Sequence, residues 1–79
     1  MERISIEMTQ EVWRPIMGYE GYYWVSNMGR VKNSYGKVLS KVDCGNGIFK
    51  VKLQAKGQRE EKYISTLMAE TFPEYFKED

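Results

Sequence analysis

The sequence predicts a small α+β domain, in which an antiparallel sheet of three to five strands over about residues 22–64 is packed by one C-terminal helix over about residues 65–72. Three observations predict this fold class. Short segments alternate between apolar and polar residues, as strands with one buried face do. Turns that contain glycine separate these segments. Beyond residue 64 the spacing of apolar residues changes to three and four, which is typical of a helix.

The sheet is expected to start with a hairpin. Residues 22–26 are aromatic and β-branched, and residues 27–29, Asn-Met-Gly, supply a short turn with a glycine that tolerates positive φ. The return strand covers residues 30–33. After a second turn at residues 34–36, alternating valine and lysine predict a further strand over residues 37–42.

The clearest strand is expected over residues 48–54. Its apolar and polar residues alternate throughout, so the register is well specified. Residues 59–64 should return beside it as a fifth strand. The alternation places Phe49, Val51 and Leu53 on one face, and Lys50, Lys52 and Gln54 on the opposite face.

The helix is expected to use Ser65 as its N-cap, because a serine hydroxyl can accept a backbone hydrogen bond there. Pro73 should end the helix, since the residue before a proline is pushed out of α geometry. The apolar stripe of this helix is expected to cover the sheet, because a few strands need such cover for stability. That stripe consists of Leu67, Met68, Thr71 and Phe72.

Charge is divided unevenly along the chain, although the net charge is only +1. Residues 1–29 carry two basic and four acidic residues, and residues 60–79 carry two basic and six acidic residues. Residues 30–59 carry eight basic residues and one acidic residue. A basic block between acidic ends suggests a polyanionic partner for the middle of the chain. Lysines that merely keep exposed strands soluble explain the block equally well.

The segment from Trp13 to Val31, WRPIMGYEGYYWVSNMGRV, resembles the NUMOD segment, fourth class, of phage and intron-encoded HNH homing endonucleases. The shared features are ordered and ungapped: the tryptophan, Gly-Tyr-Glu-Gly, Val-Ser-Asn and Gly-Arg-Val. The resemblance implies one NUMOD-like domain over residues 12–72. Residues 1–11 would be an N-terminal extension, and residues 73–79 an acidic tail.

In those endonucleases the NUMOD region forms small antiparallel sheets that contact DNA, and the HNH motif that cuts DNA follows it. The first catalytic histidine of the family usually stands where this sequence has Ser65, and later metal-binding residues would fall beyond Asp79. The residues themselves agree, because there is no histidine, one cysteine and no carboxylate cluster. Neither a metal ligand set nor a base that activates water is supplied. We therefore expect no enzyme activity, no cofactor and no metal.

The expected function is a non-catalytic, phage-derived nucleic-acid-binding module whose basic sheet face contacts double-stranded DNA. A β-ribbon can enter the major groove with its polar face toward the bases. A homodimer is left open, because one module of this size buries only a modest area. Base edges would be contacted by Arg30, Lys32, Lys50, Lys52 and Gln54, and phosphates by Lys37, Lys41, Lys56 and Arg59.

A second class of function is left open, a small phage-type inhibitor that binds a host nuclease, polymerase or defence complex. Its interface could use the aromatic residues of the tail, Phe72, Tyr75 and Phe76. The sequence has no secretory signal and no apolar run of the roughly 20 residues that a membrane helix needs. A cytoplasmic location, away from membranes, is therefore expected, and the resemblance to phage-encoded endonucleases implies a phage-infected bacterium as the host.

Aromatic residues gather between positions 13 and 24 and could stack on bases. For Trp13 and Tyr19 packing in the core is the preferred interpretation, because large aromatic side chains suit the core of a small sheet. For Trp24 and Tyr35 both interpretations are left open.

Overall fold

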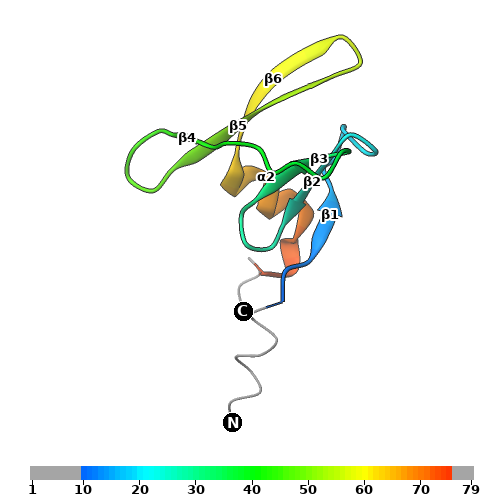
Figure 1. The fold of residues 1–79 in the computed structure, drawn as a ribbon. Coiled ribbons are helices and arrows are strands. Elements are labelled where there is room, and N and C mark those ends of the chain that lie inside the picture. The colour runs from blue at the N-terminus through cyan, green and yellow to red at the C-terminus, as the bar shows by residue number, and fades with distance from the viewer. Residues whose placement is uncertain (1–9, 76–79) are drawn as a thin grey trace.

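The computed structural model describes residues 10–75 and contains two three-stranded antiparallel sheets and one α-helix (Figure 1). The first sheet has the strand order β1-β2-β3 and the second has the order β4-β5-β6. The α+β class is therefore confirmed, with the strands divided between two sheets. The elements are β1 (Trp13–Pro15), β2 (Tyr23–Ser26), β3 (Val31–Asn33), β4 (Val42–Asp43), β5 (Phe49–Ala55), β6 (Gln58–Tyr63), α2 (Ile64–Thr71) and the 3₁₀ turn η1 (Pro73–Tyr75).

The predicted hairpin at the start of the sheet is confirmed as β2 and β3. Val25 and Val31 face each other in its register and are fully buried. The turn is held by the buried hydroxyl of Ser26, which accepts hydrogen bonds from the backbone N–H groups of Met28 (3.0 Å) and Arg30 (3.2 Å). Gly29 takes φ +81 in this turn, a conformation that other residues rarely adopt.

Strand β1 is an element that the sequence pattern did not predict. It is three residues long and includes Pro15, so it shows no alternation, and proline is tolerated because the strand lies at the sheet edge. Asn27 holds the chain just before it. The Asn27 side chain accepts a hydrogen bond from the N–H of Val12 (2.9 Å) and donates one to the carbonyl of Gln10 (3.2 Å).

The prediction of a strand over residues 37–42 is wrong. Only Val38 forms a bridge there, to Lys32 of β3, after which the chain crosses to the second sheet and pairs again as β4. The expected apolar face does not form, because Val38 and Val42 are 41% and 40% exposed. Without a buried face the alternation does not hold a continuous strand in place.

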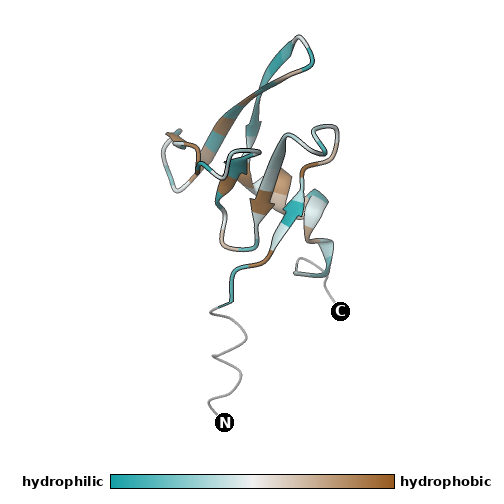
Figure 2. Ribbon diagram, turned by 45° about the vertical axis from the view of Figure 1, so that its right-hand side comes forward, coloured by the Kyte–Doolittle hydropathy of each residue, from teal (hydrophilic) through white to brown (hydrophobic). Residues whose placement is uncertain are grey.

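The long hairpin of the second sheet agrees with the prediction. Strand β5 buries Val51 and Leu53 completely, and β6 pairs with it along its whole length. Figure 2 shows hydrophobic positions near the centre of the molecule and hydrophilic ones toward the far end of this hairpin.

Helix α2 covers both sheets, as the apolar stripe predicted, and contacts β2, β5 and β6. Leu67 and Phe72 are fully buried and Met68 packs against them. The predicted N-cap is wrong, because the cap is Tyr63, without a side-chain hydrogen bond, and Ser65 lies exposed inside the first turn. The packing of its apolar face, and not a serine cap, therefore fixes the position of this helix.

Two tyrosines connect the first part of the chain to the second sheet: Tyr23 from β2, and Tyr19 from the loop between β1 and β2. The Tyr23 hydroxyl donates to the carbonyl of Gln54 (3.0 Å) and accepts from the N–H of the same residue (3.1 Å). The Tyr19 hydroxyl donates to a carboxylate oxygen of Glu60 (2.9 Å). Tyr19 is 2% exposed, which confirms its predicted place in the core, and its burial raises the pKa of its hydroxyl.

The C-terminal end of the described chain is attached to the body. The guanidinium of Arg14 in β1 lies 2.7 Å from a carboxylate oxygen of Glu74 and donates to the carbonyl of Thr71 (2.9 Å). These contacts hold η1, which is the start of the predicted acidic tail, against the first sheet. The predicted N-terminal extension and the rest of that tail lie largely outside the described residues.

Replacing Tyr23 by phenylalanine should weaken the junction between the sheets. Tyr23→Phe removes both hydrogen bonds to Gln54, so the free energy of unfolding should fall by about 1 kcal/mol, measured by urea denaturation. Amide exchange at Gln54 should become faster. Tyr35→Phe is the matched control, because Tyr35 is 93% exposed. Unchanged exchange at Gln54 in Tyr23→Phe would contradict this account of the junction.

Candidate functional site

The exposed side of the β5–β6 hairpin carries a row of polar side chains, which we call the β5–β6 face. Strand alternation sends these side chains away from buried Val51 and Leu53. In the register of the hairpin, Lys52 lies opposite Glu61 and Gln54 lies opposite Arg59. The face consists of Lys50, Lys52, Gln54, Arg59, Glu61 and Tyr63.

One of the three cations on this face is paired. The ammonium of Lys50 lies 2.7 Å from a carboxylate oxygen of Glu61. This contact raises the pKa of Lys50 and lowers the pKa of Glu61, because each charge stabilises the other. Within residues 10–75, Lys52 and Arg59 form no ion pair, and both line a depression of about 220 Å³ whose other lining residues are Glu60 and Glu61. An anionic ligand could therefore reach these two cations, but beside two carboxylates.

Arg30 lies in the turn between β2 and β3, not on the β5–β6 face, and it is already paired. Its guanidinium donates two hydrogen bonds to the carboxylate of Glu11. The hydrogen bond from Arg30 holds the pKa of Glu11 at about 2, so the carboxylate is charged at neutral pH. Any contact of Arg30 with an anion has to compete with Glu11.

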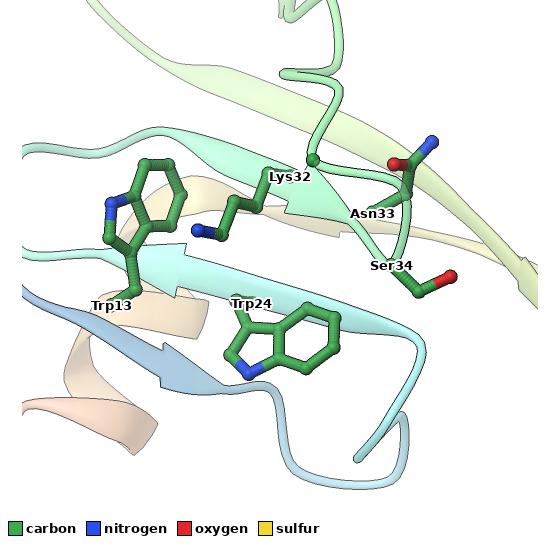
Figure 3. A pocket seen from close by; sticks show the side chains of 6 residues that line it. Trp13, Trp24, Lys32, Asn33 and Ser34 are labelled. Atoms are coloured by element: carbon green, nitrogen blue, oxygen red, sulfur yellow. The ribbon is translucent and has the colours of Figure 1, made fainter.

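Lys32 lies in an open cleft on the outer face of the first sheet (Figure 3). Its ammonium is 4.3 Å from the centre of the Trp13 ring, and the guanidinium of Arg30 is 5.5 Å from the same centre. The core position expected for Trp13 is therefore wrong, because its indole packs against cations at the surface. We call this cleft of about 330 Å³ the tryptophan cleft; it is lined by Trp13, Trp24, Lys32, Asn33, Ser34 and Gly36.

The other predicted phosphate contacts are dispersed. Lys37 and Lys41 lie in the segment that connects the two sheets, where the Lys41 ammonium is 4.9 Å from the ring centre of Phe49. Lys56 lies at the tip of the β5–β6 hairpin, and its ammonium is 5.6 Å from the ring centre of Tyr22. The structure thus brings together Lys50, Lys52, Gln54 and Arg59, and places Arg30, Lys32, Lys37, Lys41 and Lys56 elsewhere.

Sequence reasoning missed the carboxylates that pair with the predicted cations, and it preferred a core position for Trp13, while it left a surface position of Trp24 open. The pairing of Glu61 with a cation could have been predicted from the hairpin register, because a seven-residue strand followed by a tight turn places Glu61 opposite Lys52. The surface position of Trp24 could have been predicted from alternation in β2, because neighbouring strand residues face opposite sides and Val25 is buried. No local pattern indicates Glu11, which lies before an unpredicted strand.

The chemistry that these residues can perform is binding. Amino, guanidinium and amide groups can hold phosphates and hydrogen-bond to base edges. Among residues 10–75 no three His, Cys, Asp or Glu side chains lie close enough together to hold a metal ion. None of the helices in this part of the chain is long and apolar enough to cross a membrane.

The chain was compared with curated proteins, with solved structures and with models of protein families. No curated protein has a significantly similar sequence. Among solved structures, the chain is similar to one described as "DNA binding and cleavage by the HNH homing endonuclease I-HmuI", with a TM-score of 0.70 and 34% sequence identity. That match covers 77% of this chain and 36% of the endonuclease chain, so this chain spans about a third of the length of that relative.

The model of the NUMOD4 motif matches residues 11–54, which include β1 to β4 and most of β5. The matched residues contain both the tryptophan cleft and the β5 half of the β5–β6 face. More than half of the sequence lies within the match, and the resemblance inferred from residues 13–31 is confirmed. The chain belongs to the NUMOD4 motif family.

Proposed function

We propose that this chain is a non-catalytic DNA-binding module that contacts duplex DNA with its β5–β6 face. The observation that carries the proposal is the placement of Lys50, Lys52, Gln54 and Arg59 on one exposed side of a two-stranded ribbon. An antiparallel ribbon of this kind fits the major groove. Lysine and arginine can read guanine there, and glutamine can read adenine.

The shape of the molecule supports this mode of contact. Figure 1 shows the β5–β6 hairpin extending beyond the helix. Tyr19 contacts it on the side of Glu60, which is opposite the β5–β6 face, so a duplex could approach the β5–β6 face from the other side. Lys37, Lys41 and Lys56 would contact phosphates, in line with their exposed positions. About 5–8 phosphate contacts would make the affinity fall steeply with salt.

The absence of catalysis is part of the proposal. The sequence has no histidine. The family usually has its first catalytic histidine where this sequence has Ser65, which lies exposed in α2 and cannot act as an imidazole base. The endonuclease structure described above is one of DNA binding and cleavage. We propose that this chain keeps the binding function of the segment without the cutting function.

A protein-binding inhibitor is the second candidate. Of the three aromatic residues predicted for its interface, Phe72 is wrong, because it is fully buried. Tyr75 is 56% exposed, and Phe76 lies outside the described residues. A different feature favours this candidate, an open apolar groove of about 250 Å³ between the β4–β5 turn and the start of α2. It is lined by Gly47, Ile48, Phe49, Ile64, Ser65 and Met68.

Neutralising Lys52 should weaken binding to duplex DNA. Lys52→Gln removes an unpaired cation from the face, so affinity for a random-sequence duplex should fall at least about fivefold. The slope of log affinity against log salt should decrease by about 1. Fluorescence anisotropy at low and moderate salt measures both quantities.

Lys62→Gln is the matched control for Lys52→Gln. It removes the same charge from the same hairpin, but Lys62 faces the helix side and its ammonium lies 3.8 Å from a carboxylate oxygen of Glu70. It should leave DNA affinity nearly unchanged. Equal losses in both variants, or an affinity that does not respond to salt, would contradict the proposed face.

Removing Glu11 should strengthen DNA binding, because it releases Arg30. In Glu11→Gln the guanidinium no longer pairs with a carboxylate, and the salt slope should increase by about 1 as Arg30 gains a phosphate contact. The double variant Glu11→Gln with Arg30→Gln has the wild-type net charge and should lose this gain. Anisotropy titrations of the three proteins test this; the prediction fails if the double variant binds as tightly as Glu11→Gln.

A further inference from the structure

We propose that the tryptophan cleft is a separate binding site for one unpaired nucleobase, which stacks on Trp24 while Lys32 holds the adjoining phosphate. This inference rests on the proposed DNA-binding function and extends it to a different face of the molecule. It assigns a ligand class to a cleft whose lining residues the duplex-binding proposal does not use.

The cleft is built by strand register. Trp24 of β2 lies opposite Lys32 of β3 on one side and opposite Pro15 of β1 on the other, so these side chains share one face of the sheet. Trp13 joins this face at the far end of β1, and Figure 3 shows Lys32 between the two indoles. Val25 and Val31 point to the opposite face and fill the core.

The two tryptophans differ in their surroundings. Trp13 already has the cations of Lys32 and Arg30 over its ring. Within residues 10–75, Trp24 has no aromatic or cationic partner of this kind and is only partly buried. A partly exposed indole without a stacking partner offers its face to a flat ligand.

Charge and size indicate what that ligand is. The cleft of about 330 Å³ lies at the lower end of the size range of small-ligand sites, which is roughly 300–1,000 Å³. Lys32 is the one cation among its lining residues, Asn33 and Ser34 add polar groups, and no carboxylate lines it. A flat aromatic group joined to an anion complements this surface, and a nucleotide has that composition.

The base has to be unpaired. Bases in an intact duplex are stacked on their neighbours and cannot lie on a protein ring, whereas single-stranded or extruded bases can. The tryptophan cleft should therefore prefer single-stranded DNA or a duplex with an unpaired nucleotide. The β5–β6 face would still bind the paired duplex.

Intrinsic fluorescence reports on the cleft directly, because both tryptophans of the chain line it. Titration with a short oligothymidylate should quench the emission, since a base stacked on an indole changes its environment. An abasic oligonucleotide of the same length and a fully paired duplex should quench it much less. These three probes separate base stacking from phosphate binding.

A substitution at Trp24 completes the test. Trp24→Ala should weaken oligothymidylate binding about 5- to 150-fold, the usual effect of losing one base stack, measured by anisotropy with a labelled oligonucleotide. Its affinity for paired duplex should stay close to wild type. Tyr75→Ala is the control, because it removes an exposed aromatic side chain that lies outside the cleft. If Trp24→Ala is unfolded by circular dichroism, Lys32→Gln serves instead and should weaken the same probe selectively.

Two results would overturn the inference while the proposed function stands: equal quenching by oligothymidylate and the abasic oligonucleotide, or a folded variant at Trp24 or Lys32 that leaves oligothymidylate binding unchanged. A variant that weakens both paired duplex and oligothymidylate equally would also overturn it, since the cleft would then be part of a general surface. If wild type binds none of the probes, the proposed function fails together with the inference.

Discussion

The packing of α2 against both sheets is the constraint on which the rest of the structure depends. The two three-stranded sheets share one core, because each is too small to bury enough apolar area by itself. Val25 and Val31 from the first sheet meet Val51 and Leu53 from the second around Leu67 of the helix. The hydroxyl of Tyr23, bonded to both backbone groups of Gln54, fixes the junction at its edge. One small core thus stabilises the whole domain.

This core uses one face of each sheet and leaves the other faces exposed with different chemistry. The outer side of the β5–β6 hairpin carries cations and a glutamine, with Glu61 compensating part of the charge. The outer side of the first sheet carries two tryptophans around Lys32. The proposed duplex contact and the proposed base site are therefore consequences of the same alternation that builds the core.

Local patterns predicted the elements with a buried face and failed where none exists. Three elements could be predicted from the sequence, because their apolar residues recur at the required spacing: the hairpin of β2 and β3, the long hairpin of β5 and β6, and the helix that covers the sheets. β1 is three residues long, and the strand expected over residues 37–42 has exposed valines, so periodicity misled there. The pairing of Arg30 with Glu11 depends on tertiary contacts that no local pattern encodes.

The most direct test of the central claim is to map the DNA contact on the folded protein by nuclear magnetic resonance. Backbone amide shifts would be followed while unlabelled duplex DNA is added to the ¹⁵N-labelled chain. The account predicts that the largest changes occur in β5 and β6 around Lys52, Gln54 and Arg59, with little change in α2. Changes concentrated around Ile48 and Met68 in the apolar groove, or no changes in the β5–β6 hairpin, would contradict it.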